Sequence, residues 1–321
     1  MISAVSNFLM NPSTLIFIIL TVILRIITSK QRERASLYYK KTSDLMKRFV
    51  NETKIKDLYY TPYTFAFNGH LQAILCCILE LFLNVYYPVK YERELFTLSD
   101  GGTIAYDWVI DHDGGTPKKD SKRPILCCFP GLSGGNNTLY LYSMIKAATE
   151  KGYKCVVINF RGCGGLKLTS PKIYWMCNWQ DVQEPIEHIH SKYCSGIKEY
   201  QKRNIYAYSL SLGAGMLTKY MIATGDKCVL NGSVNYCTFY NVQDNVPFFK
   251  SNALKLYDFF LGLTYYNVLK KKEQELKEVF GEDKANEFLQ SVRLNNRSLM
   301  DISEKSLSSL FGYSSIEEYY E

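Results

Sequence analysis

The stretch NIYAYSLSLGAGMLTKYM, residues 204–221, decides the fold class. Its pattern predicts a strand that runs into a helix through a sharp turn, with Ser211 in the turn. A nucleophile elbow has this arrangement and requires small residues two positions before and two positions after the serine, because the strand and helix backbones approach closely. Ser209 and Gly213 occupy these positions, so a serine replaces the first glycine of the G-x-S-x-G pattern.

Ser209 is the competing candidate nucleophile, since it is also flanked by small residues, Ala207 and Ser211. It lies further inside the predicted strand and lacks a glycine two positions later, which favours Ser211. The degenerate S-x-S-x-G pattern is also compatible with an ordinary strand-to-helix junction that carries no chemistry. A second feature of the chain must therefore support the elbow.

Strands and helices alternate from Tyr91 onward. Apolar and polar residues alternate on both sides of Asp100-Gly101-Gly102, which predicts a hairpin. The alternation predicts an α/β fold with a mostly parallel sheet covered by helices on both faces, and an active site at the carboxyl ends of its strands. The expected strands are 125–129, 154–160 and 204–209, and the expected helices lie near 139–151 and 179–193.

The loop FPGLSGGNN, residues 129–137, supplies the second feature because it follows a buried strand of this sheet. An acyl-transfer site needs two backbone N–H groups directed at the developing oxyanion, one from such a loop and one from the residue after the nucleophile. Leu132 and Leu212 are the expected donors. A phosphate-binding loop is the alternative interpretation, but the G-x-x-x-x-G-K-[ST] pattern is absent.

Residues 8–27, FLMNPSTLIFIILTVILRII, predict a membrane anchor because they carry no charge before Arg25 and are long enough to cross a bilayer core. A cleaved signal peptide is the alternative, although no basic segment precedes the run and no A-x-A-like site follows it. The second apolar run, 71–88, contains Glu80 and predicts a helix packed in the core or at an interface.

The net charge of +7 lies in one segment, since residues 25–56 contain ten basic and three acidic side chains and the rest of the chain is neutral. This distribution favours anionic lipid headgroups over nucleic acid as the partner. Basic residues after the anchor place the main domain on the cytoplasmic side. The ten cysteines contain no C-x-x-C pair and no metal-ligand spacing, which indicates free thiols in a reducing compartment.

Several stretches together resemble the membrane-anchored branch of the α/β-hydrolase-domain proteins. The resemblance implies an α/β-hydrolase fold with a helical cap at 241–297, an anchor with a basic segment at 1–36, and a hydrolase domain at 37–321. It implies carboxylester hydrolysis on acylglycerols, phospholipids or short-chain esters, with Ser211 as nucleophile and no cofactor or metal. The stretches are NGHLQAIL (68–75), DGGTIAYDW (100–108), FPGLSGG (129–135), GYKCVVINFRGCGG (152–165), LTSPKIYWMCNWQDV (168–182), SLSLGAGML (209–217) and LFGYSSIEEYYE (310–321).

The histidines depart from the family pattern, in which the acid and the histidine follow the serine. All four precede Ser211: His70, His112, His188 and His190. We expect His112 in a polar turn, and His188 and His190 on a helix far from the elbow, whereas His70 is the one candidate base. The expected explanation is that the chain stops before the strands that carry the acid and the histidine. The alternative function is an inactive relative that binds lipid or a partner.

Overall fold

The computed structural model describes residues 11–30, 32–86, 89–118, 121–195, 202–241, 244, 247, 251, 255–294, 298–303, 310–313 and 318. The chain divides into two compact units, Met1–Tyr86 and Tyr87–Glu321, and each is described by itself.

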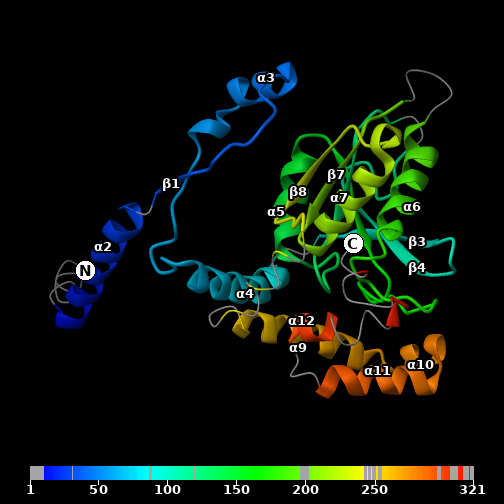
Figure 1. The fold of residues 1–321 in the computed structure, drawn as a ribbon. Coiled ribbons are helices and arrows are strands. Elements are labelled where there is room, and N and C mark those ends of the chain that lie inside the picture. The colour runs from blue at the N-terminus through cyan, green and yellow to red at the C-terminus, as the bar shows by residue number, and fades with distance from the viewer. Residues whose placement is uncertain are drawn as a thin grey trace. The chain divides into compact units, whose positions relative to one another are not determined.

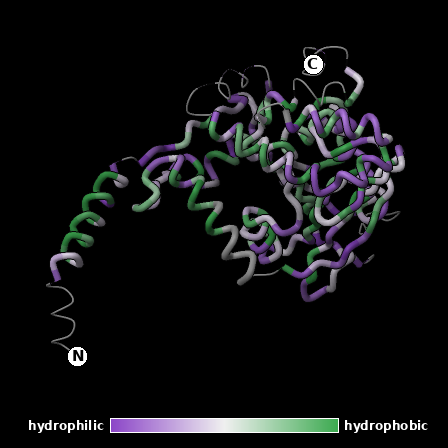
Figure 2. Tube along the Cα trace, turned by 90° about the horizontal axis from the view of Figure 1, so that it is seen from below, coloured by the Kyte–Doolittle hydropathy of each residue, from purple (hydrophilic) through white to green (hydrophobic). Residues whose placement is uncertain are grey.

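The first unit begins with helix α2, Pro12–Lys30, which covers most of the predicted anchor. Most of its residues are apolar, as the green colour of this helix in Figure 2 shows. Its large apolar side chains are exposed. It is the one helix among the described residues that is long and apolar enough to cross a membrane. Residues 8–10 of the predicted anchor lie outside the described residues.

Short elements follow α2 in the first unit. Strand β1 (Glu33–Arg34) pairs antiparallel with β2 (Tyr59–Tyr60), and between them lie helix α3 (Asp44–Glu52) and the 3-10 turn η1 (Lys54–Asp57). Helix α4, Gly69–Tyr86, is the second apolar run. Its Ile74, Ile78 and Leu79 side chains are exposed, so they do not pack in a core of the first unit. The alternative position at an interface stays a prediction.

The second unit contains a six-stranded sheet in the order β3-β4-β6-β5-β7-β8 (Figure 1). The first two pairings, β3–β4 and β4–β6, are antiparallel and the other three are parallel, which confirms the mostly parallel sheet. The turn between β3 and β4 is closed by the Leu98 N–H, which donates to the Gly102 carbonyl at 2.7 Å. The strands are β3 Tyr91–Thr97, β4 Thr103–Val109, β5 Ile125–Phe129, β6 Lys154–Asn159, β7 Ile205–Leu210 and β8 Gly232–Tyr236.

Helices cover both faces of this sheet, because successive residues of its central strand enter different clusters of buried side chains. In β5, Cys127 packs with helices α6 (Gln180–Ile189) and α7 (Leu212–Thr224), and Cys128 packs with helix α5 (Leu139–Glu150). This two-sided burial explains why the strand sequence ILCCF has no polar residue. The predicted α/β-hydrolase architecture is confirmed.

The residues predicted to form a cap and the segment after them contain four described helices: α9 (Lys255–Lys271), α10 (Glu273–Phe280), α11 (Glu282–Leu294) and α12 (Leu299–Ile302). That these helices act as a cap stays a prediction. The buried Asp258 carboxylate accepts hydrogen bonds from the Ser298 hydroxyl and the Met300 N–H, which fastens α12 to α9. The Lys272 ammonium donates to the Leu166 carbonyl at 2.7 Å and so attaches this helical segment to the loop after β6.

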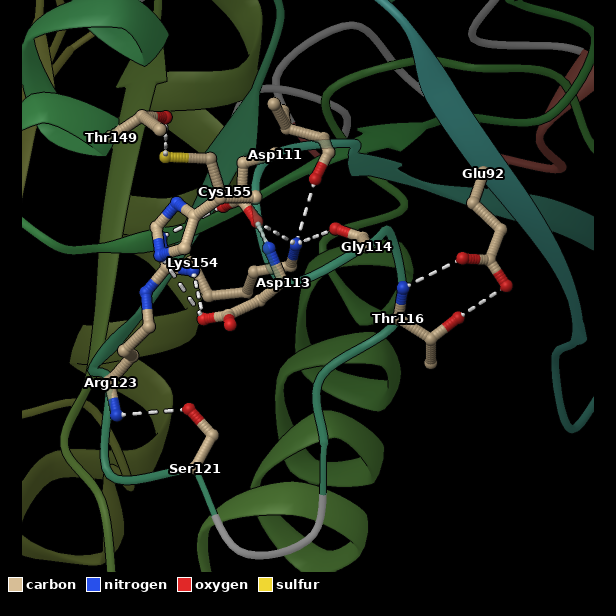
Figure 3. Close-up of polar contacts among 12 residues, drawn as sticks. Glu92, Asp111, Asp113, Gly114, Thr116, Ser121, Arg123, Thr149, Lys154 and Cys155 are labelled. Atoms are coloured by element: carbon tan, nitrogen blue, oxygen red, sulfur yellow. Dashed lines mark hydrogen bonds and ion pairs between the residues drawn. The ribbon is translucent and has the colours of Figure 1, made fainter.

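A network of hydrogen bonds and ion pairs lies at the amino-terminal end of the parallel strands (Figure 3). The buried Lys154 ammonium donates to the Val109 carbonyl at 2.8 Å and pairs with Asp111 at 3.3 Å. Burial lowers the pKa of Lys154. Burial alone would raise the pKa of Asp111, but hydrogen bonds, mainly from Arg123, hold it at about 2. The network fixes the loop that connects β4 to β5.

Candidate active site

Ser211 occupies the turn between β7 and α7 at the carboxyl end of the sheet (Figure 1). Its φ is 52° and its ψ is −116°, a conformation that is unfavourable for any residue with a Cβ atom. The turn is held on both sides, because the Ser211 N–H donates to the Tyr236 carbonyl of β8 at 2.9 Å and its carbonyl accepts from Gly215 at 3.0 Å. A strained serine held in this way is the geometry of a nucleophile elbow.

Two glycines allow the close backbone approach that the elbow needs. A Cβ atom on Gly213 would lie 2.5 Å from the Pro130 carbonyl oxygen, so no side chain fits at that position. A Cβ atom on Gly131 would lie 3.3 Å from the Ser211 Cβ. The loop after β5 and the serine turn therefore lie against each other.

Ser209 lies in a different environment from Ser211. Its side chain is fully buried in β7, and its hydroxyl donates to the Asn235 side chain of β8 at 3.1 Å. Ser211 is partly exposed, and among the described residues its hydroxyl has no hydrogen-bond partner. Ser209 thus links two strands, whereas the Ser211 hydroxyl is free to react.

The Leu132 and Leu212 amides have no acceptor within the part of the chain that the structure describes. Leu212 is the first residue of α7, where backbone N–H groups have no partner in the helix. Leu132 is in the loop that contacts the serine turn, one residue after Gly131, whose N–H donates to the Tyr140 hydroxyl at 2.9 Å. Both amides are free to donate to an oxyanion.

A buried carboxylate that the sequence pattern did not reveal supports the 129–137 loop. Asp107, in the middle of β4, accepts hydrogen bonds from Arg93, from Asn159 at 2.7 Å and from Asn136 at 2.6 Å. The Asn136 N–H also donates to the Asn159 side chain at 3.1 Å. The sequence does contain one indication of this carboxylate. Asp107 is a charged residue within the apolar strand TIAYDWV, and Arg93 lies opposite it on the paired strand.

Arg161 forms a second buried network at the same end of the sheet. It pairs with Asp181 at 2.6 Å and with Asp100 at 2.8 Å, and it donates to the Ser170 hydroxyl at 2.6 Å. Burial raises the pKa of Asp181 despite Arg161 beside it. Burial also acts to raise the pKa of Asp100, but hydrogen bonds, mainly from Arg161, hold it at about 2. The network joins the β3–β4 turn, the loop after β6 and α6.

The structure places no histidine of the second unit beside Ser211. His112 follows β4, which runs antiparallel to β6, so it lies at the opposite end of the sheet, 3.5 Å from Asp113. His188 stacks on Phe96 with ring centroids 4.6 Å apart, which makes it a packing residue on the β3–β4 side. Burial lowers the pKa of His188. His190 lies in the π-turn η2, His190–Cys194, and His70 belongs to the first unit.

The Cys163 thiol does not compete with Ser211 as a nucleophile. Cys163 lies in the loop after β6, and burial raises the pKa of its thiol to about 12, so it stays protonated. The described cysteines form no disulfide bond with one another. No cluster of three or more potential metal ligands occurs among the residues that the structure describes.

Known proteins with similar sequences include lipid hydrolases. The chain is 29% identical to human "Phospholipase ABHD3" over 264 residues, which cover 81% of this chain and 59% of that protein. It is 25% identical to human "Monoacylglycerol lipase ABHD2" over 82% of this chain and 60% of that protein. The "Embryogenesis-associated protein EMB8" of Picea glauca is 27% identical over 81% of this chain and 55% of its own length. The chain thus spans less than two thirds of these relatives.

No family model matches the chain. Solved structures with some likeness include a fungal esterase from Rhizomucor miehei, with a TM-score of 0.38 and 11% identity over 67% of each chain. The relatives also include "Abhydrolase domain-containing protein 2" of Drosophila melanogaster, 27% identical over 59% of this chain and 45% of its own length. From its sheet topology, its serine turn and these relatives, we conclude that the chain belongs to the α/β-hydrolase superfamily.

Proposed function

We propose that this protein is a serine-nucleophile carboxylester hydrolase that acts at a membrane on lipid-like esters: acylglycerols, phospholipids or short-chain esters. The observation that carries the proposal is the strained Ser211 turn, with a free hydroxyl and two free amides beside it. Strain of this kind is maintained only where the surrounding structure holds it in place, and it is concentrated at functional sites.

The proposed reaction passes through an acyl-enzyme. The Ser211 oxygen attacks the ester carbonyl carbon, and the Leu132 and Leu212 N–H groups stabilise the negative charge that develops on the carbonyl oxygen. Collapse of the tetrahedral intermediate breaks the ester C–O bond and releases the alcohol, which takes up a proton. Water then attacks the acyl-enzyme and releases the acid. Both attacks require a base to accept a proton.

The relatives support a lipid substrate, since two of them are named as a phospholipase and a monoacylglycerol lipase. The surface of helix α9 gives independent support for a lipid substrate. Its Leu256, Phe259 and Phe260 side chains are exposed, and basic side chains lie at its ends. Exposed aromatic residues near lysines suit a surface that meets lipid.

An inactive relative that binds lipid is the second candidate function. It is favoured by the positions of the histidines, because His112 and His188 have other contacts and lie away from Ser211. A serine hydroxyl is a weak nucleophile without an adjacent base. The two candidate functions differ in whether Ser211 reacts with an electrophile.

Labelling with a fluorophosphonate probe tests the proposed function. In detergent micelles we expect slow modification of the full chain, with the adduct on Ser211 in the tryptic peptide 204–219. Added imidazole should raise the rate, since it supplies a base. The adduct is located by fragment-ion mass spectrometry. Absence of an adduct, under conditions that modify a known serine hydrolase, would favour the inactive relative. Fast labelling that His70→Ala abolishes would instead identify His70 as the base.

Helix α2 should hold the full chain in the membrane through alkaline carbonate washing. Nineteen residues in a helix of mean hydropathy 2.0 are enough to span the hydrocarbon core. The measurement compares the full chain with a variant that lacks residues 1–30, by immunoblotting of pellet and supernatant. The anchor proposal is wrong if carbonate releases both proteins to the same extent.

We further propose that the second unit lies on the cytoplasmic side, because basic residues follow α2. The same membranes test this orientation through the exposed N-x-[ST] sites at Asn51 and Asn231. Such sites are glycosylated only on the lumenal side. Glycosidase treatment should leave the mass of the chain unchanged, and a decrease in mass would place the second unit in the lumen.

A further inference from the structure

Helix α3, which follows the proposed anchor α2 within the first unit, has one apolar and one polar side. Its first turn is capped by the Ser43 hydroxyl oxygen, which accepts from the Met46 N–H at 3.3 Å. A helix turns by about 100° per residue, so residues one, four and five positions apart can share a side. The apolar side of α3 consists of Leu45, Met46, Phe49 and Val50. The charged residues lie on the other side, which makes α3 an amphipathic helix.

Packing within the chain covers only part of this apolar side. Val50 is 8% exposed, whereas Leu45 is 73% exposed and Phe49 is 46% exposed. Leu45 and Phe49 are four residues apart, so their side chains are neighbours on the helix surface. Contact with water is unfavourable for both side chains. Helix α3 thus presents an apolar pair that the chain itself leaves open.

Basic side chains without an ion-pair partner flank α3. Inside the helix, the two basic residues pair with Asp44 at 3.0 Å and with Glu52 at 3.1 Å, so the charges of α3 balance. The flanking lysines are exposed and form no ion pair with any residue that the structure describes. They are Lys40 and Lys41 before the helix, and Lys54 and Lys56 in the turn η1 after it. Positive charge at both ends of α3 is therefore available to an anionic partner.

The strand pair of the first unit adds exposed aromatic rings beside arginines. Tyr59 and Tyr60 of β2 are both exposed. The guanidinium groups of Arg32 and Arg34 lie over the Tyr59 ring, 4.3 Å and 4.9 Å from its centroid. Arginine and tyrosine each combine an apolar body with a polar end, and tyrosine is enriched where the hydrocarbon core of a membrane meets water. The strand pair therefore also suits the boundary between lipid and water.

We propose that α3 lies in the headgroup region of an anionic membrane, with Leu45 and Phe49 on lipid and the flanking lysines on the headgroups. An acidic protein or a nucleic acid would pair with the lysines but leave the apolar pair in water. An anionic bilayer satisfies both. The short segment between Lys30 and Asp44 keeps α3 near the surface at which α2 ends. The inference rests on the proposed action at a membrane and is independent of the chemistry at Ser211.

Hydrogen exchange of the full chain in lipid nanodiscs tests this contact. One disc contains phosphatidylcholine alone, and the other an equimolar mixture of phosphatidylcholine and phosphatidylserine. Phosphatidylserine should slow exchange of the 44–52 amides at least about tenfold, because each basic residue near an anionic surface strengthens the attraction about fivefold. High salt should remove the slowing. The α2 amides should be protected in both discs, so a failure of the anchor is detected separately.

Charge reversal should remove the effect of phosphatidylserine. In the double variant Lys40→Glu, Lys41→Glu two attractions become repulsions, so the 44–52 amides should exchange at nearly the same rate in both discs. The matched control is Lys146→Glu, Lys151→Glu, which reverses two exposed lysines of the second unit. This control should retain the full slowing. The proposal is overturned if the control loses the slowing as completely as the test variant.

Truncation of the apolar pair provides a second test. Leu45→Ala, Phe49→Ala keeps good helix formers in α3 and should lose most of the slowing. Its exchange in phosphatidylcholine discs should match that of the wild type, which shows that the helix is intact. Ile222→Ala, Val234→Ala is the control, because both side chains are exposed in the second unit. Equal exchange of the wild-type 44–52 amides in both discs overturns the proposal, and slow exchange in both would identify a protein contact instead.

Discussion

Ser211→Ala should abolish fluorophosphonate labelling and any ester hydrolysis, whereas Ser209→Ala should retain both. Replacement of the serine removes the oxygen that the probe is expected to modify, so labelling should fall to background. The loss of hydrolysis should be smaller than in a complete triad, because in a triad the loss of the base alone already removes most of the activity. The physical reason is position, since Ser211 has a free, partly exposed hydroxyl and the buried Ser209 hydroxyl is bonded to Asn235.

Ser209→Ala is the matched control, because both changes remove one hydroxyl from the same peptide. It loses one strand-to-strand hydrogen bond, worth about 1 kcal/mol of unfolding free energy. Labelling is measured by in-gel fluorescence, and hydrolysis with a short-chain fluorogenic ester. Labelling that survives Ser211→Ala and disappears in Ser209→Ala would show that Ser209 is the nucleophile.

Arg161→Met should lower the free energy of unfolding by about 3–5 kcal/mol, the cost of leaving a buried charge without its partner. Asp181 is 1% exposed in its side chain and depends on Arg161 to remain ionised. Without Arg161, burial raises its pKa further, so the carboxylate is disfavoured in the folded state. A carboxyl group whose pKa is raised by folding contributes fully to the stability of the fold only below its unfolded-state pKa. This contribution is lost as the pH rises through the folded-state pKa. The loss should therefore be larger at alkaline than at mildly acidic pH.

Urea denaturation of the full chain in micelles measures this loss. All three tryptophans, Trp108, Trp175 and Trp179, lie in the second unit, so tryptophan fluorescence reports on that unit alone. The double variant Arg161→Met, Asp181→Leu is the control and should recover most of the loss, because no buried charge remains. A double variant as unstable as Arg161→Met would mean that packing, rather than charge, accounts for the loss.

The sequence by itself determined the hairpin, three strands of the sheet, the two helices between them and the position of the serine turn, whereas strand β8 was not predicted. The periods of apolar residues and the turn glycines are local, so strands such as 125–129 could be located from neighbouring residues alone. The elbow pattern is local as well, because it is a spacing of small residues around Ser211, although the close contact that Gly213 permits is with the Pro130 carbonyl of a distant loop. Local patterns also predicted that His112 lies in a polar turn and that His188 and His190 lie on a helix away from the serine turn.

The tertiary structure decided which polar groups meet. Arg161 pairs with Asp181 and Asp100, which are 20 and 61 residues away along the chain. Asp107 meets Asn159 at a separation of 52 residues because β4 lies beside β6. The hydrogen bond of Ser209 to Asn235 follows from the pairing of β7 with β8, and Ser133 and Tyr265 line one small pocket because α9 packs there. Such pairs depend on strand order and helix packing, which no local pattern of residues specifies.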